Sequence, residues 1–217
     1  MVIITIDGAA GTGKTTVGIL TANRLNFDFL DTGKIYRAFT LKLIKDSISL
    51  EKKEIIKHLD KTKINYSYKE KKESVYLNKI DITDEILSKE VDNNVSLVSK
   101  IPEVRDKMTS LQRSIVSDKN FVVVGRDIGT VVLPNAELKI FLIASIEERA
   151  RRRFAEREDQ SYSDILESIK NRDVIDSTRE VAPLKTPENA VIIDTEGIDI
   201  IEVSNKIIKE IDNEHSI

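Results

Sequence analysis

The fold is decided by one stretch near the start of the chain, Val2-Ile3-Ile4-Thr5-Ile6-Asp7-Gly8-Ala9-Ala10-Gly11-Thr12-Gly13-Lys14-Thr15-Thr16. Its apolar first half predicts a buried strand, and its second half matches the phosphate-binding pattern G-x-x-x-x-G-K-[ST]. Glycines allow the tight turn that points successive backbone N–H groups at one anion. The helix-forming segment that follows adds the positive end of its dipole. We therefore predict that residues 8–16 bind the phosphates of a nucleotide.

Two side chains of this loop carry its chemistry. Lys14 would place a positive charge between the outer phosphates of the nucleotide. The hydroxyl of Thr15 would ligate Mg²⁺, so we expect ATP with Mg²⁺ as the ligand. The alternative is a glycine-rich turn with a purely structural role that binds no ligand. The complete motif, located between a strand and a helix, argues against this alternative.

Composition narrows the class of protein. A chain of 217 residues suits one α/β domain with an insert, and 40% hydrophobic with 33% charged residues is typical of a globular protein. The absence of cysteine excludes disulfides, thiolate metal sites and cysteine nucleophiles. A net charge of −3 argues against a general nucleic-acid binder. We see neither a membrane span nor a leader segment, and therefore expect a cytoplasmic monomer without nucleic-acid or membrane partners.

Short apolar runs alternate with helical patterns along the chain, which is typical of a parallel α/β sheet. After the first strand, we predict strands at 27–30, 121–124, 138–142 and 190–194. Helices are predicted at 15–25, 35–44, 88–99, 102–116, 145–153, 163–173 and 200–211. The sequence thus indicates a P-loop NTPase fold with a five-stranded parallel sheet flanked by helices, forming a single domain over residues 1–217.

Residues 60–95 have a different character. Glycine is absent, Lys and Glu dominate, and the segments Ile64–Tyr68 and Ser74–Asn78 alternate as short antiparallel strands do. We predict a small inserted antiparallel β subdomain. The charged run Lys69–Glu73 is interpreted as its solvated hairpin tip.

Two further patterns suggest a regulatory GTPase. Asn78-Lys79-Ile80-Asp81 matches the guanine-reading pattern N-K-x-D, and Asp194-Thr195-Glu196-Gly197 matches D-x-x-G. In GTPases, D-x-x-G precedes N-K-x-D, whereas here it follows by more than a hundred residues. Asn78 also follows a polar, half-exposed segment where a buried strand is required. We interpret both patterns as coincidental.

Arginines at the ends of predicted elements point to a second anion site. Five of them lie on separate segments, and a further group crowds one helical turn between Arg149 and Arg153. Phosphoryl transfer needs little covalent chemistry from a protein, so catalysis consists mainly of positioning and charge neutralisation. Two phosphate-bearing substrates require cations for both, which favours a kinase. A single arginine taken alone is more often a surface ion-pair partner. The five separate arginines are Arg37, Arg105, Arg126, Arg172 and Arg179.

The chain resembles the bacterial cytidylate kinases, a family of nucleoside monophosphate kinases, in segments spread over nearly its full length. The most distinctive is Gly125-Arg126-Asp127-Ile128-Gly129-Thr130-Val131-Val132-Leu133-Pro134. The others are Val2–Thr16, Leu30–Arg37, Glu147–Ala150 and Val181–Leu184. The resemblance implies transfer of the γ-phosphoryl group of ATP to CMP or dCMP with Mg²⁺, in pyrimidine nucleotide metabolism. A sibling kinase that acts on UMP, AMP or a non-nucleotide hydroxyl is the nearest alternative.

The resemblance also implies roles for individual residues. Residues 8–16 would hold the ATP phosphates, and Lys14 would stabilise the group in transfer. A lid region over residues 149–180 would close over the phosphates and exclude water, with catalytic arginines at positions Arg149, Arg152 and Arg153. The acceptor nucleotide would contact seven residues: Thr32, Arg37, Arg105, Arg126, Asp127, Arg172 and Arg179.

The base specificity has a physical reason. Arg126 and Asp127 would reach cytosine and its surroundings. An Asp carboxylate accepts a hydrogen bond from the exocyclic amine of cytosine, but not from the carbonyl that uracil presents at the same place. An Asp-containing base site therefore rejects UMP.

Three positions depart from the family pattern. Val124 stands where the family often carries an acidic residue, so a carboxylate that would orient Mg²⁺ is missing there. The loop reads Gly13-Lys14-Thr15-Thr16 where the family commonly has G-K-G-T. The segment Asp173–Thr178 is less basic than expected, which predicts weaker phosphate affinity on the lid side.

Overall fold

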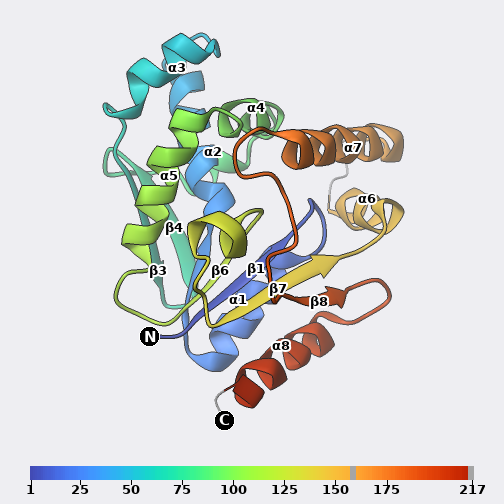
Figure 1. Cartoon of the computed structure of the whole chain (residues 1–217). Helices are drawn as coiled ribbons and strands as arrows, with labels where there is room; N and C mark the ends of the chain where they lie inside the picture. The colour runs from blue at the N-terminus through green and yellow to red at the C-terminus, as the bar shows by residue number, and fades with distance from the viewer. Residues whose placement is uncertain (157–159, 215–217) are drawn as a thin grey trace. The chain divides into compact units, whose positions relative to one another are not determined.

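The computed structural model describes residues 1–156 and 160–214, and Figure 1 shows its ribbon. The chain divides into two compact units. The first consists of Met1–Phe29 and Lys119–Ile217, and the second of Leu30–Asp118. The phosphate loop lies in the first unit, and the three-stranded insert lies in the second.

A five-stranded parallel sheet with strand order β2-β6-β1-β7-β8 is the framework of the first unit, so this prediction is confirmed. In β1 and β6 every residue is buried, as expected for strands covered on both faces. Asp7 pairs with Gly125 of β6 and Gly8 pairs with Leu142 of β7. The loops that follow β1, β6 and β7 therefore leave the sheet at the same edge. The strands are β1 (Ile3–Gly8), β2 (Asp28–Asp31), β6 (Phe121–Gly125), β7 (Leu138–Ile143) and β8 (Val191–Asp194).

Helices of this unit pack on the sheet and on one another. α1 (Lys14–Leu25) approaches β6 closely at Gly18, where an added Cβ would lie 2.6 Å from Val124. α8 (Ile200–Glu214) packs on α1, and the Thr21 hydroxyl donates to the Ser204 hydroxyl at 3.1 Å. The remaining elements are the π-helical turn η2 (Ile128–Val132), α6 (Ile146–Ala155) and α7 (Tyr162–Thr178).

α7 and η2 differ from the prediction. α7 continues to Thr178, five residues beyond the predicted end at Asp173, and the N–H of its cap residue Arg179 donates to the carbonyl oxygen of Ile175 at 3.2 Å. Residues 128–132, for which neither a helix nor a strand was predicted, form a helical turn in which the N–H groups of Val131 and Val132 donate to the carbonyl oxygen of Asp127. Residues 157–159, within the predicted lid region, lie outside the described residues.

The second unit combines helices with a small antiparallel sheet of order β3-β4-β5. Both turns of this sheet contain two residues with positive φ, as hairpins of the type I′ class require. They are Glu70-Lys71 between β3 and β4, and Asn78-Lys79 between β4 and β5. Its elements are α2 (Thr32–Lys45), α3 (Lys52–Leu59), β3 (Ile64–Lys69), β4 (Lys72–Leu77), β5 (Ile80–Asp81), the 3₁₀ turn η1 (Glu85–Leu87), α4 (Lys89–Ser99) and α5 (Pro102–Ile115).

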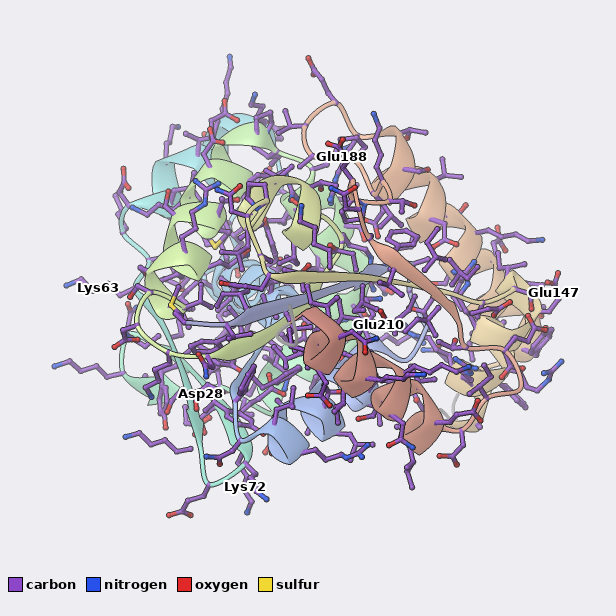
Figure 2. The ribbon with its side chains drawn as sticks, turned by 60° about the horizontal axis from the view of Figure 1, so that its bottom comes forward. Asp28, Lys63, Lys72, Glu147, Glu188 and Glu210 are labelled. Atoms are coloured by element: carbon purple, nitrogen blue, oxygen red, sulfur yellow. The ribbon has the colours of Figure 1, made fainter. Side chains whose placement is uncertain are left out.

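Two features of this unit were not predicted. α3 forms because Ile55 and Leu59, four residues apart, supply one buried face in an otherwise charged segment. Glu73, predicted within a solvated tip, instead has a side chain that is only 6% exposed and accepts hydrogen bonds from Lys34 and Tyr66. The tip is confined to Glu70 and Lys71, and Figure 2 labels the neighbouring Lys72, whose side chain extends outward.

The N-K-x-D pattern is the β4–β5 hairpin, with Asn78 and Lys79 as the turn residues. A guanine-reading loop would follow a strand of the parallel sheet, so this placement agrees with the interpretation of the pattern as coincidental. Among the residues that the structure describes, no helix is long and apolar enough to cross a membrane.

Candidate active site

The phosphate loop has the backbone that its glycines permit. Gly11 and Gly13 adopt φ values of 80° and 84°, in the left-handed region, and Gly13 is the N-cap of α1. Space is also limited, because a Cβ at Gly8 would lie 2.4 Å from the carbonyl oxygen of Leu142. The loop therefore leads directly into the first turn of α1, which contains Lys14, Thr15 and Thr16.

Lys14 is buried and folds back over the loop. Its Nζ donates to the carbonyl oxygen of Ala9 at 2.6 Å and to Thr12 Oγ1 at 3.3 Å. The ammonium group therefore lies at the loop itself, where it can neutralise a phosphate held by the backbone N–H groups. A cavity of about 400 Å³ adjoins the loop, lined by Ala9, Thr12, Phe141–Ala144 and Leu184–Thr186.

One of the predicted lid arginines, Arg149, contacts this loop from α6. Arg149 is buried, and it donates to the carbonyl oxygens of Ala10 at 3.1 Å and Ala144 at 3.2 Å. It also pairs with Asp173 of α7 at 2.6 Å. These contacts hold one guanidinium group against the phosphate loop.

Arg152, one turn further along α6, is held by different partners. It bonds Glu148 Oε1 at 2.9 Å and both oxygens of Thr195, the hydroxyl at 3.0 Å and the carbonyl at 2.6 Å. Thr195 is the residue that follows β8. It also belongs to the D-x-x-G pattern at residues 194–197, so one residue of this pattern holds Arg152 in place. Arg153 is the next residue of the same helix.

A second group of predicted residues meets beside the end of β6. Arg126 Nε lies 2.9 Å from Asp176 Oδ2, and Arg179 Nη2 lies 3.2 Å from Asp127 Oδ1. Arg179 also faces Asp176 Oδ1 at 3.7 Å and donates to the carbonyl oxygen of Ala182 at 2.5 Å. The structure therefore brings Arg126, Asp127 and Arg179 into one network of charges.

Asp176 is the centre of this network, and the sequence analysis did not identify it. Burial alone would raise the pKa of its carboxyl, but the charges of Arg126, Arg172 and Arg179 outweigh that effect and hold the pKa below its usual range. A signal was present, because Arg172, Asp176 and Arg179 are spaced by four and three residues and so share one helical face.

The remaining predicted residues lie in the second unit around the start of α2. Asp31 caps this helix by accepting from the N–H of Gly33 at 2.9 Å, and Thr32 is its buried first residue. Arg37, one turn later, pairs with Asp92 of α4 and donates to the carbonyl oxygen of Ile86 at 3.2 Å. The structure thus gives Arg37 a fixed position within this unit.

Arg105 of α5 joins the same helix through an aromatic contact. Its guanidinium carbon lies 5.4 Å from the ring centroid of Tyr36, and its Nη1 donates to the carbonyl oxygen of Ser99 at 3.1 Å. Arg105 is only 3% exposed, and its buried guanidinium group is held by this cation–π contact and by the Ser99 carbonyl oxygen. Thr32, Arg37 and Arg105 therefore all lie on or against the first turns of α2.

The donor set around the phosphate loop fits a magnesium ion carried by a nucleotide. No group of three or more His, Cys, Asp or Glu side chains suited to a metal occurs among residues 1–156 and 160–214. Mg²⁺ in phosphoryl-transfer sites typically takes one or two protein oxygens and completes its shell with phosphates and water. The Thr15 side chain, in the first turn of α1, has an oxygen of this kind, whereas the buried apolar side chain of Val124 has none.

Comparison with known proteins identifies relatives over the full length. The family model described as cytidylate kinase matches residues 4–213. A cytidylate kinase of Fusobacterium nucleatum is 43% identical over 97% of both chains. One from a Geobacillus strain is 46% identical over 97% of this chain and 96% of its own.

Solved structures share the fold at lower identity. A shikimate kinase of Bacteroides thetaiotaomicron matches with a TM-score of 0.51 and 16% identity over 97% of both chains. A protein of Eubacterium ventriosum matches with a TM-score of 0.53 and 16% identity over 98% of both chains. These two similarities describe the fold alone.

Proposed function

The chain belongs to the cytidylate kinase family and phosphorylates CMP or dCMP, and we propose that it takes the phosphoryl group from Mg²⁺-ATP with the residues described above. The observation that carries this proposal is the parallel register of β1 and β6. Because Asp7 pairs with Gly125, the phosphate loop and the Arg126-Asp127 turn begin side by side at one edge of the sheet. Ligands bind at this edge in open α/β sheets.

On the donor side, residues 8–16 bind the phosphates of ATP. Their backbone N–H groups and the N-terminus of α1 face the anion, and Lys14 neutralises the charge that spreads over the group in transfer. Thr15 ligates Mg²⁺, which neutralises phosphate oxygens when bound. The left-handed glycines and the position of Lys14 Nζ at the loop support this assignment.

The arginines of α6 act on the same phosphates. Arg149, Arg152 and Arg153 form the cationic face of the lid, which excludes water so that ATP is not hydrolysed in place of transfer. The contacts of Arg149 with Ala10 and of Arg152 with Thr195 support a position next to the loop for the first two.

On the acceptor side, Asp127 reads the base. Its carboxylate accepts from the exocyclic amine of cytosine, while Arg126 supports the same contact. Arg172 and Arg179 bind the sugar and phosphate side, and Thr32, Arg37 and Arg105 complete the acceptor contacts. The ion pair between Arg179 and Asp127 supports a shared place for these two residues on the acceptor side.

A substitution of Asp127 by Asn tests the base-reading role. The amide can donate to the uracil carbonyl, so we expect D127N to lower kcat/KM for CMP relative to UMP by about 10-fold to 100-fold. Affinity for ADP, measured by calorimetry, should change less than about threefold.

A matched control is available three residues away from Asp127, at Thr130. Thr130→Val replaces a buried hydroxyl that makes no hydrogen bond in the part of the chain that the structure describes. In this variant the ratio of kcat/KM for CMP over UMP and the affinity for ADP should both stay unchanged. Equal loss of CMP turnover and ADP affinity in D127N would instead assign Asp127 to the fold or to metal binding.

A further inference from the structure

Asp7 is a buried carboxylate that the roles above do not use. It is the penultimate residue of β1, immediately precedes the phosphate loop, and has no exposure to solvent. Its Oδ1 accepts from the backbone N–H of Ile128 at 2.8 Å, and its Oδ2 accepts from that of Gly129 at 2.7 Å. Both oxygens are therefore bonded to the segment that follows Asp127.

These two N–H groups begin the helical turn η2, whose N-cap is Asp127. The first N–H groups of a helix have no acceptor within it, so an outside acceptor determines where the turn is anchored. The other side of the turn is also confined, because a Cβ at Gly129 would lie 2.9 Å from Pro187 and 3.0 Å from Thr5 Oγ1. The turn has little room to move once Asp7 holds it.

The charges around Asp7 connect the two loops. The pKa of Asp7 is raised to about 6, mainly by burial and to a smaller extent by the nearby charge of Asp127. The N–H groups of Gly129 and Ile128 and the charge of Lys14 act in the opposite direction. Asp7 is therefore ionised at neutral pH, and its electrostatic partners include the lysine of the phosphate loop and the Asp of the base-reading turn.

We propose that Asp7 is a positioning residue that fixes the Arg126-Asp127 turn at a set distance from the phosphate loop, by binding the amides of Ile128 and Gly129. The inference rests on the proposed role of Asp127 as the base reader. Asp7 acts through the backbone and touches neither substrate. Its effect should therefore appear in base selectivity more than in nucleotide affinity at the phosphate loop.

Asp7→Asn in the full chain is the direct test. The amide keeps the shape and one acceptor oxygen but turns an N–H donor toward one of the two backbone N–H groups. We expect the ratio of kcat/KM for CMP over UMP to fall by about 10-fold, while ADP affinity by calorimetry changes less than about threefold. In the double variant D7N/D127N the loss should be no larger than in D127N, because both changes act on one contact.

The matched control is Thr5→Val, on the same strand and the same face as Asp7. Thr5 is buried and its hydroxyl makes no hydrogen bond in the described residues, so selectivity should stay unchanged. If D7N does not fold, Gly129→Ala displaces the same amide by steric contact and should lower the CMP to UMP ratio while Asp7 remains.

The outcomes separate the two proposals. The inference would be overturned if D127N lost its preference for CMP over UMP while D7N kept it. Where D7N does not fold, Gly129→Ala takes its place in this comparison. Either result would leave the proposed function intact. An equal loss of ADP affinity and CMP turnover in D7N would also overturn it, because Asp7 would then serve the phosphate loop. Unchanged selectivity in D127N itself would contradict the base-reading role on which the inference rests.

Discussion

At the scale of single residues, Asp7 makes the stability of the fold depend on pH in an unusual direction. Its pKa is about 6 in the folded protein, compared with 3.8 for an ordinary Asp. Between these values the folded chain binds more protons at this site than the unfolded chain. The contribution of Asp7 to the free energy of unfolding therefore falls as pH rises from about 4 to 6 and stays low above that range.

This sign predicts the behaviour of D7N, which has no titrating group at the site. The free energy of unfolding of the natural protein minus that of D7N should be larger at about pH 4.5 than at about pH 7, by about 2 kcal/mol. Urea unfolding of both proteins at the two pH values measures it. A difference that is constant, or larger at about pH 7, would contradict the raised pKa.

Asp176 shows why single residues of the site escaped the sequence analysis. Its partner Arg126 lies fifty positions earlier in the chain, so no local pattern could reveal the ion pair. The phosphate loop is the opposite case, because Gly11, Gly13 and Lys14 are close in sequence and each is required by local backbone geometry. The residues of the phosphate loop were therefore predictable from the sequence, whereas the pairing of Asp176 with Arg126 was not.

At the scale of elements, the packing of α1 on the sheet depends on one glycine. A Cβ at Gly18 would lie 2.6 Å from Val124 and 2.8 Å from Phe29, both buried. Gly18→Ala gains helix propensity, yet we expect a net loss of about 1–3 kcal/mol in the free energy of unfolding because the helix must shift away from β6.

Urea unfolding tests this prediction, with Asn205→Ala in α8 as the control. Asn205 is exposed, so its replacement should change the free energy of unfolding by less than about 0.5 kcal/mol. A Gly18→Ala variant as stable as the natural protein would show that the contact between α1 and β6 tolerates a methyl group.

Helices and strands differ in how well their own residues predicted them. The strands β1, β6 and β7 are largely apolar runs and were predicted within one residue at most ends. The helix α3 was not predicted, since only Ile55 and Leu59 mark its buried face within a charged segment. The turn η2 depends on amide anchoring by Asp7 from another strand, which no pattern within residues 128–132 records.

At the scale of the whole molecule, the sheet order and the family identify the reaction class. The five-stranded parallel sheet and the match over residues 4–213 agree with the fold and family resemblance seen in the sequence. The roles of individual residues toward the acceptor stay predictions, because Thr32, Arg37 and Arg105 belong to one unit and Arg126, Asp127 and Arg179 to the other.

The most direct test of the account is an acceptor panel. ADP release is measured with ATP and Mg²⁺ in the presence of CMP, dCMP, UMP, AMP, GMP or no acceptor. We predict fast release with CMP and dCMP and slow release in every other case. Of the two pyrimidine bases in the panel, only cytosine presents an amine to the Asp127 carboxylate, whereas uracil presents a carbonyl. Equal release with every acceptor, or release that needs none, would contradict the assignment as a cytosine-selective kinase.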